Sequence, residues 1–417
     1  MAVLCAVSAL AAPGLATAAP TTAAGRAAQR IVVRFQPGVS PARRSALLAQ
    51  AGARPIRTLR RLGLTVARVP PSQRSEAVAL LRSSGATRFV SPEHAFRIAL
   101  APTDPEYATT PWPFTQLGLP LAWDTTTGSS SVIVAVLDTG VAPGALDLAG
   151  RLVAGYDISG GDADPSDDHG HGTEVASTLA GGIDNGFASV GACPLCRIMP
   201  VKVMDAAGGG TTADIAAGIT WATDHGARII NMSLGGPSDD PALDAAVGYA
   251  IAHDVLVVAA AGNNGTTAPE YPAAIPGVVS VAATDGAGAL QVFSEHGSWV
   301  DVAAPGCVTT ATMTNATASV CGTSFAAPLV AGVAGLTLSN SPSLSEAQLR
   351  AALETHTSGH GTIDVANGIV DASSMVGPPA PSTTPVGGAP AQPAASPGRA
   401  TRSHARRTAR LRPKLRR

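Results

Sequence analysis

Three polar side chains lie in short motifs whose residue types suit acyl transfer. Asp138 ends the apolar run VIVAVL in the motif DTG, His171 lies in DDHGHGTEVAS, and Ser324 lies in CGTSFAAPLVAG. Serine-dependent hydrolysis needs a hydroxyl that attacks the carbonyl, an imidazole that takes and returns its proton, and a carboxylate that orients the imidazole. The three motifs together predict a nucleophilic Ser324, with His171 as its base and Asp138 as the partner of the base.

Each motif taken alone also has a simpler interpretation. Asp138 could cap the turn after its strand, and the aspartic-protease chemistry that DTG suggests would need a second such motif, which the sequence lacks. His169 and His171, which follow two aspartates, could bind zinc. Ser324 could be the N-cap of a helix. The occurrence of all three motifs in one chain favours the catalytic interpretation.

In this order, the three motifs resemble those of the subtilisin-like serine protease family. The resemblance covers roughly residues 112–372 and includes a fourth motif, AAAGNNG, whose Asn263 matches the oxyanion-binding side chain of the family. It implies that Asn263 and the backbone N–H of Ser324 stabilise the tetrahedral intermediate. Glu174 and Ser177 depart from the usual HGTHVAG, which affects the helix after the base and not the chemistry.

The resemblance also implies where a peptide substrate binds. Glu270, the residue before Tyr271-Pro272, aligns with the base of the primary specificity pocket and would favour Lys or Arg before the scissile bond. The alternative is that Glu270 points to solvent and that the pocket accepts Leu or Phe. The two strands that hold the substrate backbone correspond to five residues here: Ser233, Leu234 and Gly235 on one side, with Gly209 and Gly210 on the other.

A structural calcium ion (Ca2+) is a further implication of the resemblance. Asp147 and Asn185 fall where the strong calcium site of the family takes side-chain oxygens, and Asp104 could supply another. Calcium prefers oxygen ligands from carboxylates, amides and backbone carbonyls. The alternative is that these residues are ordinary solvated surface groups.

The amino-terminal end reads as a secretory signal over residues 1–19. An apolar run is followed by Ala16-Thr17-Ala18, which fits an A-x-A cleavage site, although no Lys or Arg precedes the run. A membrane anchor is the alternative, but Pro13 and Gly14 interrupt the run. No later stretch is apolar over the roughly 20 residues that a spanning helix needs. We expect a secreted protein that is extracellular or associated with the cell envelope.

The cysteines agree with an oxidising compartment. Apart from Cys5, four remain, which is an even number. The segment from Cys307 to Cys321 reads as a hairpin centred near Thr314 with the two cysteines roughly opposite each other, so we expect Cys307–Cys321 and Cys193–Cys196 disulfides. A zinc site at Cys193-x-x-Cys196 is a weaker alternative, because no second C-x-x-C accompanies it. A redox role is also weaker, because the motif lacks thioredoxin-like surroundings.

Charge divides the chain into blocks of opposite sign. Residues 26–97 carry 14 arginines against two acidic residues, whereas residues 102–376 carry five basic residues against 27 acidic ones. Within residues 26–101 the pattern predicts a β-α-β-β-α-β unit of ferredoxin-like type. In position and pattern this unit resembles the propeptide of subtilisin-like proteases, which implies a folding assistant and inhibitor removed by self-cleavage. The alternative is a basic accessory domain that stays attached.

We expect the acidic block, residues 102–376, to form the catalytic domain. Near-continuous apolar runs such as VIVAVL, RIINMSL and VLVVAAA are typical of strands covered on both faces, and helical patterns separate them. This alternation predicts an α/β fold with a mostly parallel sheet flanked by helices. Asp138, Ser233 and Asn263 each follow a predicted strand, at the sheet edge where such folds bind ligands.

The carboxyl-terminal end reads as a linker and a tail. Residues 377–398 are rich in Pro, Ala and Gly, and residues 399–417 carry nine basic residues and no acidic one. The tail could bind an anionic cell-envelope polymer or simply be solvated, and its lack of aromatic residues gives no support for nucleic-acid binding. The main prediction is a monomeric secreted endopeptidase acting on proteins or peptides. An envelope-binding or peptide-binding protein on a protease fold is the alternative.

Overall fold

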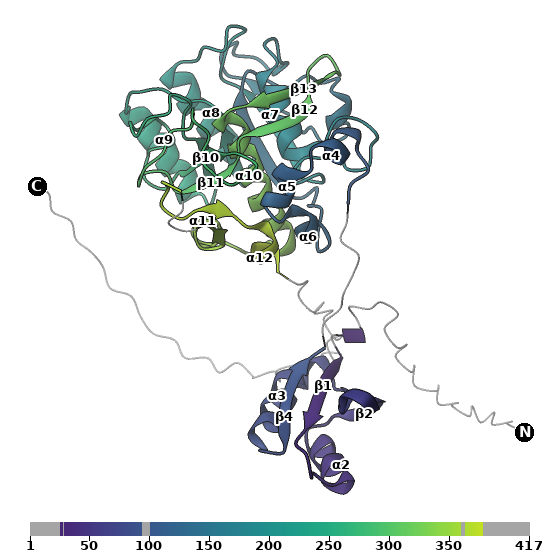
Figure 1. Ribbon diagram of the computed structural model, residues 1–417. Helices are drawn as coiled ribbons and strands as arrows, with labels where there is room; N and C mark the ends of the chain where they lie inside the picture. Colours follow the sequence, from purple (N-terminus) through teal and green to yellow (C-terminus); the bar gives the residue numbers. More distant parts are fainter. Residues whose placement is uncertain (1–25, 28, 94–100, 360–362, 378–417) are drawn as a thin grey trace, which may run out of the picture. The chain divides into compact units, whose positions relative to one another are not determined.

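The computed structural model describes residues 26, 27, 29–93, 101–359 and 363–377 (Figure 1). The predicted signal segment and basic tail, and all of the predicted linker except Gly377, lie outside the described residues. The described residues form a four-stranded sheet in the arginine-rich block, and a nine-stranded and a two-stranded sheet in the acidic block. The two blocks have separate hydrophobic cores.

The N-terminal domain has the predicted β-α-β-β-α-β order. Its four strands form an antiparallel sheet in the order β2-β3-β1-β4. In β1, Ile31, Val33 and Phe35 are buried and alternate with half-exposed residues, so one face of the sheet packs on the core beneath the helices. The elements are β1 (Arg30–Phe35), α2 (Pro41–Gln50), β2 (Arg54–Leu59), η1 (Arg60–Leu62), β3 (Leu64–Arg68), η2 (Pro71–Gln73), α3 (Arg74–Ser83) and β4 (Thr87–Pro92).

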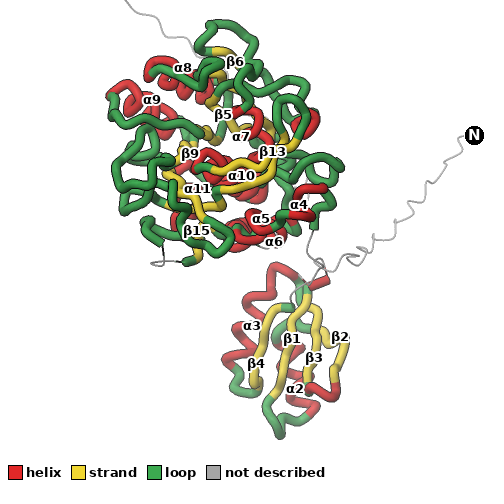
Figure 2. Tube along the Cα trace, turned by 45° about the horizontal axis from the view of Figure 1, so that its top comes forward, coloured by secondary structure: helices red, strands yellow, loops and turns green. Residues whose placement is uncertain are grey.

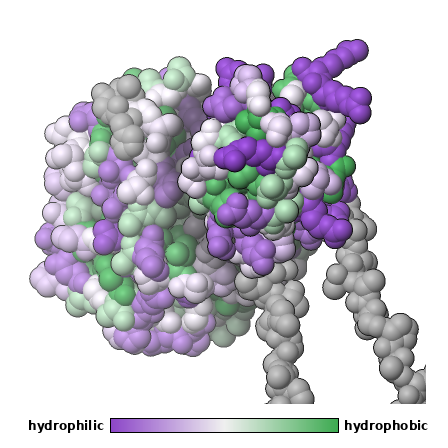
Figure 3. All heavy atoms as spheres, turned by 90° about the horizontal axis from the view of Figure 1, so that it is seen from below, coloured by the Kyte–Doolittle hydropathy of each residue, from purple (hydrophilic) through white to green (hydrophobic). Residues whose placement is uncertain are grey.

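The arginines of the N-terminal domain lie on its surface. Every described arginine in this domain is exposed or half-buried, including Arg54 and Arg57 on the edge strand β2. Figure 3 shows strongly hydrophilic side chains interspersed with hydrophobic ones on the face of this domain that it presents. The positive charge predicted from the sequence is therefore available at the surface.

The acidic block forms a nine-stranded sheet in the order β14-β15-β11-β10-β9-β8-β5-β7-β6. All neighbouring strands are parallel except β14, which is antiparallel to β15. The predicted mostly parallel α/β sheet is confirmed. The strands are β5 (Ile133–Asp138), β6 (Tyr156–Asp157), β7 (Arg197–Lys202), β8 (Ile229–Met232), β9 (Leu256–Ala260), β10 (Val279–Thr284), β11 (Val302–Pro305), β14 (Thr357–Ser358) and β15 (Ile369–Val370).

Helices cover both faces of this sheet (Figures 1 and 2). Helices α8 and α9 lie side by side against β5, β7 and β9, whereas α7 and α10 pack on the opposite layer. The helices are α4 (Pro105–Thr109), α5 (Trp112–Gln116), α6 (Leu119–Trp123), η3 (Leu146–Leu148), α7 (His171–Ala180), α8 (Thr212–Asp224), α9 (Pro241–Ala252), α10 (Thr323–Asn340), α11 (Glu346–Thr355) and α12 (Ala372–Val376).

Strand β5 shows why the predicted strands are continuous apolar runs and do not alternate apolar with polar residues. Val134 and Val136 point into the layer that contains α7 and α10, whereas Ala135 and Leu137 point into the layer that contains α8 and α9. Both sets are buried, so successive residues of a central strand need apolar side chains. The strand ends at Asp138, which lies at the carboxyl edge of the sheet.

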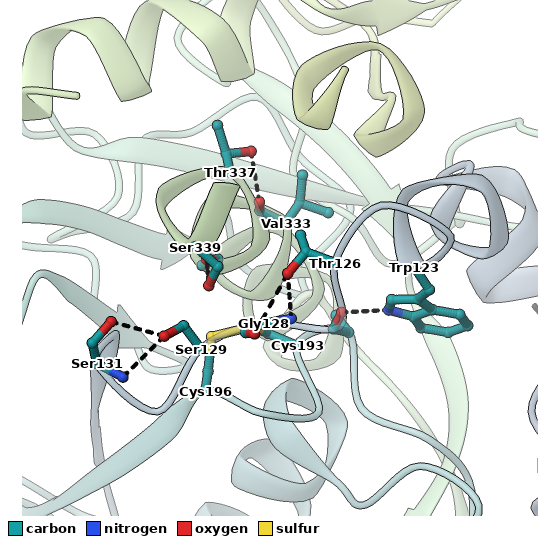
Figure 4. Close-up of a disulfide and its surroundings, with 12 residues drawn as sticks. Trp123, Thr126, Gly128, Ser129, Ser131, Cys193, Cys196, Val333, Thr337 and Ser339 are labelled. Atoms are coloured by element: carbon teal, nitrogen blue, oxygen red, sulfur yellow. Dashed lines mark hydrogen bonds between the residues drawn. A yellow bond between two sulfur atoms is a disulfide. The ribbon is translucent and has the colours of Figure 1, made fainter. Parts of the chain in front are cut away.

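Both predicted disulfides are present. Cys307 and Cys321 are paired residues of the hairpin formed by β12 (Cys307–Ala311) and β13 (Thr317–Cys321), and their sulfurs are bonded. The second disulfide, Cys193–Cys196, is buried beside α10 (Figure 4). A methyl group on Gly335 would lie 2.8 Å from Cys196 Sγ, so α10 passes close to this disulfide.

No helix within the described residues is long and apolar enough to cross a bilayer.

Candidate active site

Asp138 and His171 are in direct contact. Asp138 ends β5 and is fully buried, and His171 is the first residue of α7. The Nδ1 atom of His171 lies 2.7 Å from Asp138 Oδ1 in a hydrogen bond that a carboxylate can only accept. The same oxygen accepts the backbone N–H of Thr139 at 2.8 Å, which fixes the orientation of the carboxylate.

The electrostatic surroundings of His171 favour its protonated form. Burial lowers the pKa of the imidazole, but the charge and hydrogen bond of Asp138, together with the charges of Glu174 and Asp167, outweigh it. The pKa of His171 therefore lies above its ordinary value. An imidazole in this setting is a strong base when neutral, and its cation is stabilised once it has taken a proton.

Asp167 holds the segment that carries His171, a role the sequence analysis did not assign. Its Oδ2 accepts the backbone N–H and the hydroxyl of Thr173 at 2.9 and 2.6 Å, and its Oδ1 accepts the N–H of Gly170 at 2.8 Å. The hydroxyl of Thr139 also donates to Oδ1, at 2.9 Å. Asp167 therefore ties the first turn of α7 to the residue after Asp138, and it acts as a positioning residue.

Ser324 is the second residue of α10 and lies beside the end of β8. Its hydroxyl donates to the carbonyl of Ser233 at 3.3 Å, and the hydroxyl of Ser233 donates to the carbonyl of Ser324 at 2.7 Å. The ring of His171 packs near Phe325, the residue after Ser324, with 5.9 Å between the ring centroids. The helix thus brings Ser324 into the neighbourhood of His171, with its hydroxyl resting on Ser233.

Asn263 follows β9 and binds the residue before Ser324. Its side-chain oxygen accepts the backbone N–H of Thr323 at 2.8 Å and the Thr323 hydroxyl at 3.1 Å. This fixes the amide oxygen and leaves the NH2 group as the available donor. Asn263 is thereby held next to Ser324, which lies 61 positions later in the chain, through the hydrogen bonds to Thr323.

The predicted substrate-binding residues lie around the same strand ends. Ser233, Leu234 and Gly235 directly follow β8, and Gly236 exchanges two backbone hydrogen bonds with Tyr271, at 2.9 and 2.8 Å. Gly210 pairs with Met204 in a turn whose backbone also bonds Asp205 to Gly209. The structure therefore places one set at the end of β8 and the other in the turn that follows β7.

Glu270 is half-buried against the segment after β8. A methyl group on Gly235 would lie 3.0 Å from Glu270 Oε2, and the Nδ2 of Asn264 donates to Glu270 Oε1 at 2.8 Å. Burial and the nearby charge of Glu295 raise the pKa of Glu270, and the hydrogen bond from Asn264 opposes them. Glu270 is therefore directed at the protein and not simply at solvent.

Glu295 is a second carboxylate at this place, and the sequence analysis missed it. It is fully buried, and both of its oxygens accept the backbone N–H of Asn264 at 3.0 Å. A methyl group on Gly262 would lie 2.7 Å from Glu295 Oε2 and 3.0 Å from Glu270 Cγ, so the two acidic side chains flank this glycine. In the sequence Glu295 appears only as one acid in a polar loop, with no motif around it.

The three predicted calcium ligands come together. The carboxylate of Asp104 accepts the backbone N–H groups of residues 184, 185 and 186, and Asn185 Nδ2 donates to Asp147 Oδ1 at 2.9 Å. Asp147 Oδ2 is buried without a hydrogen-bond partner among the described residues. Burial raises the pKa of Asp147 to about 7, opposed by hydrogen bonds from Asn185 and Gly182 and reinforced by the charge of Asp104.

The donor chemistry of this place suits calcium. A buried carboxylate oxygen with no partner is costly, and a bound cation would remove that cost. Within the described residues no cluster of three or more His, Cys, Asp or Glu side chains could hold a metal. A calcium ion here would need amide or backbone carbonyl oxygens besides Asp147, which is the type of ligand set that calcium accepts.

The geometry can be compared with known proteins. A model of the subtilase family matches residues 129–377, which is more than half of the chain. The chain belongs to the subtilase family. This subtilase is 43% identical to thermitase from Thermoactinomyces vulgaris over 265 residues, which are 63% of the chain and 94% of thermitase. It is 37% identical to subtilisin Savinase from Lederbergia lenta over 264 residues, which are 63% and 97% of the two chains.

Solved structures agree with the sequence relatives. A protease from Pseudoalteromonas arctica superposes on this subtilase with a TM-score of 0.61 at 33% identity, covering 66% of the chain and 99% of that protease. The subtilase is therefore a subtilisin-like serine endopeptidase, as the motifs predicted.

Proposed function

We propose that Asp138, His171 and Ser324 form the catalytic triad of this endopeptidase. The observation that carries the proposal is the 2.7 Å contact between Asp138 and His171, with Ser324 held at the end of the neighbouring strand β8. The buried Asp138 carboxylate sets the tautomer of His171 that leaves Nε2 free to accept a proton.

The reaction follows from these positions. The Ser324 hydroxyl turns from the Ser233 carbonyl, gives its proton to His171 Nε2, and its oxygen bonds to the substrate carbonyl carbon. His171 then returns the proton to the leaving amine as the peptide C–N bond breaks, which leaves an acyl-enzyme. A water molecule repeats the sequence through His171, releases the carboxylic acid and restores Ser324.

Asn263 stabilises the negative charge that develops on the carbonyl oxygen. Its side-chain oxygen is occupied by Thr323, so its NH2 group is the donor left for the substrate oxygen, together with the backbone N–H of Ser324. Such preorganised donors act where charge forms in the transition state, and losing one costs about 10²–10³-fold in turnover.

The N-terminal domain acts as an inhibitory propeptide. Residues 26–101 are positively charged and residues 102–376 are strongly negative, so electrostatic attraction steers and stabilises docking. The predicted signal segment and the two disulfides are consistent with export. We place the signal at residues 1–19, the linker at 377–398 and the basic tail at 399–417, where the tail offers a contact for an anionic envelope polymer.

Self-processing provides the test of the triad. Ser324→Ala should accumulate as a full-length precursor, whereas the parent should lose its N-terminal domain and hydrolyse casein. The variant Ser339→Ala, on the same helix, is the matched control and should mature normally. Purified Ser324→Ala that matures without a helper protease would contradict self-processing.

Glu270 and Glu295 direct the specificity toward basic residues. Two carboxylates flank Gly262 next to the substrate-binding segment 233–235, and the hydrogen bonds they accept from neutral donors do not cancel their charge. A Lys or Arg side chain of the substrate, entering beside Gly235 and Gly262, would supply the missing positive charge.

Calcium binds at Asp147, with Asn185 and the loop that Asp104 holds. The unpartnered Asp147 Oδ2 supports this assignment. In the uncleaved Ser324→Ala precursor, chelation of calcium should lower the melting temperature of the catalytic domain by several degrees. Asp147→Asn should abolish this calcium response, and Asp244→Asn on α9 should preserve it. A response that survives Asp147→Asn would place the ion elsewhere.

A further inference from the structure

The catalytic domain has few basic side chains, and most of them have acidic partners. Residues 102–376 carry five basic residues against 27 acidic ones. Lys202 lies 2.6 Å from Asp168, and Arg228 lies 3.2 Å from Asp254. Arg350 lies within 3.3 Å of both Glu346 and Glu354. The two remaining basic residues are Arg151 and Arg197.

Arg151 and Arg197 are cross-strand neighbours. Leu152 and Ile198 form a parallel bridge, in which Ile198 N–H donates to the carbonyl of Arg151 at 3.0 Å and Val153 N–H donates to the carbonyl of Ile198 at 2.9 Å. This register sets the two arginines opposite each other with their side chains on the same face. Like charges directly opposite each other on neighbouring strands are destabilising.

No ion pair among the described residues offsets this repulsion. Neither arginine takes part in an ion pair among the described residues, and the Nε atom of each is buried without a hydrogen-bond partner there. Burial and the charge of Arg197 lower the pKa of Arg151. Asp147 opposes this shift through its charge but forms no ion pair with Arg151. A domain with 27 acidic residues therefore places two of its five cations side by side without an ion-pair partner among the described residues.

The arginine pair is separate from the catalytic residues. Strand β7 begins at Arg197 and ends at Lys202, which pairs with Asp138 of β5. Five residues of strand separate the two positions, which is about 16 Å along the sheet. The pair thus lies at the amino edge of the strands, opposite the edge that carries the active site.

We propose that Arg151 and Arg197 form a binding site for a small inorganic oxyanion, sulfate or phosphate, which stabilises the catalytic domain. Each guanidinium can donate two parallel N–H bonds to such an ion, and Arg matches tetrahedral oxyanions well for this reason. One bound dianion cancels the charge of both arginines and replaces the repulsion between them by two attractions.

The test is thermal unfolding with sodium sulfate as the probe. The full-length Ser324→Ala protein is melted in sulfate and in sodium chloride of equal ionic strength, so that general screening is the same. Sulfate should raise the melting temperature of the catalytic transition by about 2 °C or more. Arg197→Gln should lose this rise and, in chloride, should melt no lower than its parent because the repulsion is gone.

Arg228→Gln is the matched control, since Arg228 has an acidic partner. It should melt lower than the parent in chloride, because Asp254 and the Leu344 carbonyl lose their donor, and it should keep the sulfate response. Sulfate binding at other arginines of the chain should contribute equally to the melting temperature of every variant. The proposed site is therefore measured by the part of the sulfate-induced rise that Arg197→Gln removes. Arg151→Gln should repeat the Arg197→Gln result.

Two results would overturn the proposal. An equal sulfate response in the parent, Arg151→Gln and Arg197→Gln would show an adventitious ion effect only. A fall in melting temperature in chloride for Arg197→Gln as large as that for Arg228→Gln would show that Arg197 is stabilised by a partner within the chain.

Discussion

Two regions of the catalytic domain each bring a pair of titratable side chains together, and the pairs differ in charge. In the first, the buried Asp138 carboxylate faces an imidazole that can become positive, at 2.7 Å. In the second, Glu270 and the buried Glu295 face each other across Gly262, and the hydrogen bonds they receive from described residues come from neutral groups. The first pair becomes an ion pair within the protein when His171 is protonated, whereas the second has no cationic partner among the described residues.

This difference explains the separate roles we assign to them. A base must work with any substrate, so its partner charge has to be part of the chain and permanently in place. A specificity site that lacks its own cation discriminates between substrates. The correct substrate supplies the positive charge, whereas an incorrect one leaves the carboxylates unpaired. The raised pKa of Glu270, caused by burial and then by Glu295, has the sign expected of a pair without a cation.

The largest effect should come from neutralising Asp138. Asp138→Asn keeps the shape of the residue but no longer favours the productive tautomer of His171, so kcat should fall about 10⁴-fold for every peptide. Initial rates on basic and apolar peptides measure this. The exposed Asp244→Asn is the matched control and should leave kcat unchanged. A loss confined to basic peptides would mean that Asp138 acts through substrate charge and not through His171.

A smaller and selective effect should follow from Glu270→Gln. Removing one of two carboxylates should lower kcat/KM for peptides with Arg before the scissile bond by roughly 10–100-fold and leave Leu peptides nearly unchanged. The measurement is the ratio of kcat/KM for paired peptides that differ only in Arg, Lys, Leu or Phe at that position. Glu354→Gln on α11 is the control. A preference for Leu or Phe in both the parent and Glu270→Gln would end the proposal.

The pH dependence of that ratio sharpens the same comparison. The pKa of Glu270 is raised, so lowering the pH should protonate it earlier than an ordinary glutamate. The preference for Arg over Leu in the parent should therefore fall as the pH falls, while protonation of His171 cancels in the ratio. In Glu270→Gln the ratio should depend less on pH.

Much of the fold and the positions of the candidate site residues at strand ends could be predicted because they depend on local patterns. Apolar runs covered on both faces predicted the parallel strands, and strand ends carry Asp138, Ser233 and Asn263 in recognisable motifs. The Cys307–Cys321 pairing followed from the symmetry of a short hairpin. In each case the signal lies within about 15 residues of chain.

The missed features depend on segments that meet only in the folded protein. Glu295 is important because its loop packs against Asn264 and Gly262, and nothing near it in sequence indicates burial. Asp167 belongs to a run of acids that looks solvated, yet its hydrogen bonds to Thr139 and Thr173 hold the His171 segment. The placement of Arg151 beside Arg197 likewise depends on a strand register that no single stretch of sequence encodes.

The most direct test of the central claim is to identify the residue that a fluorophosphonate probe labels in the mature enzyme. The probe reacts covalently with a serine activated by a neighbouring base, and peptide mapping by mass spectrometry locates the adduct. We predict one adduct, on Ser324, with its rate of formation strongly reduced in Asp138→Asn and unchanged in Asp244→Asn. An active enzyme that carries the adduct on another residue, or that resists labelling altogether, would contradict the account.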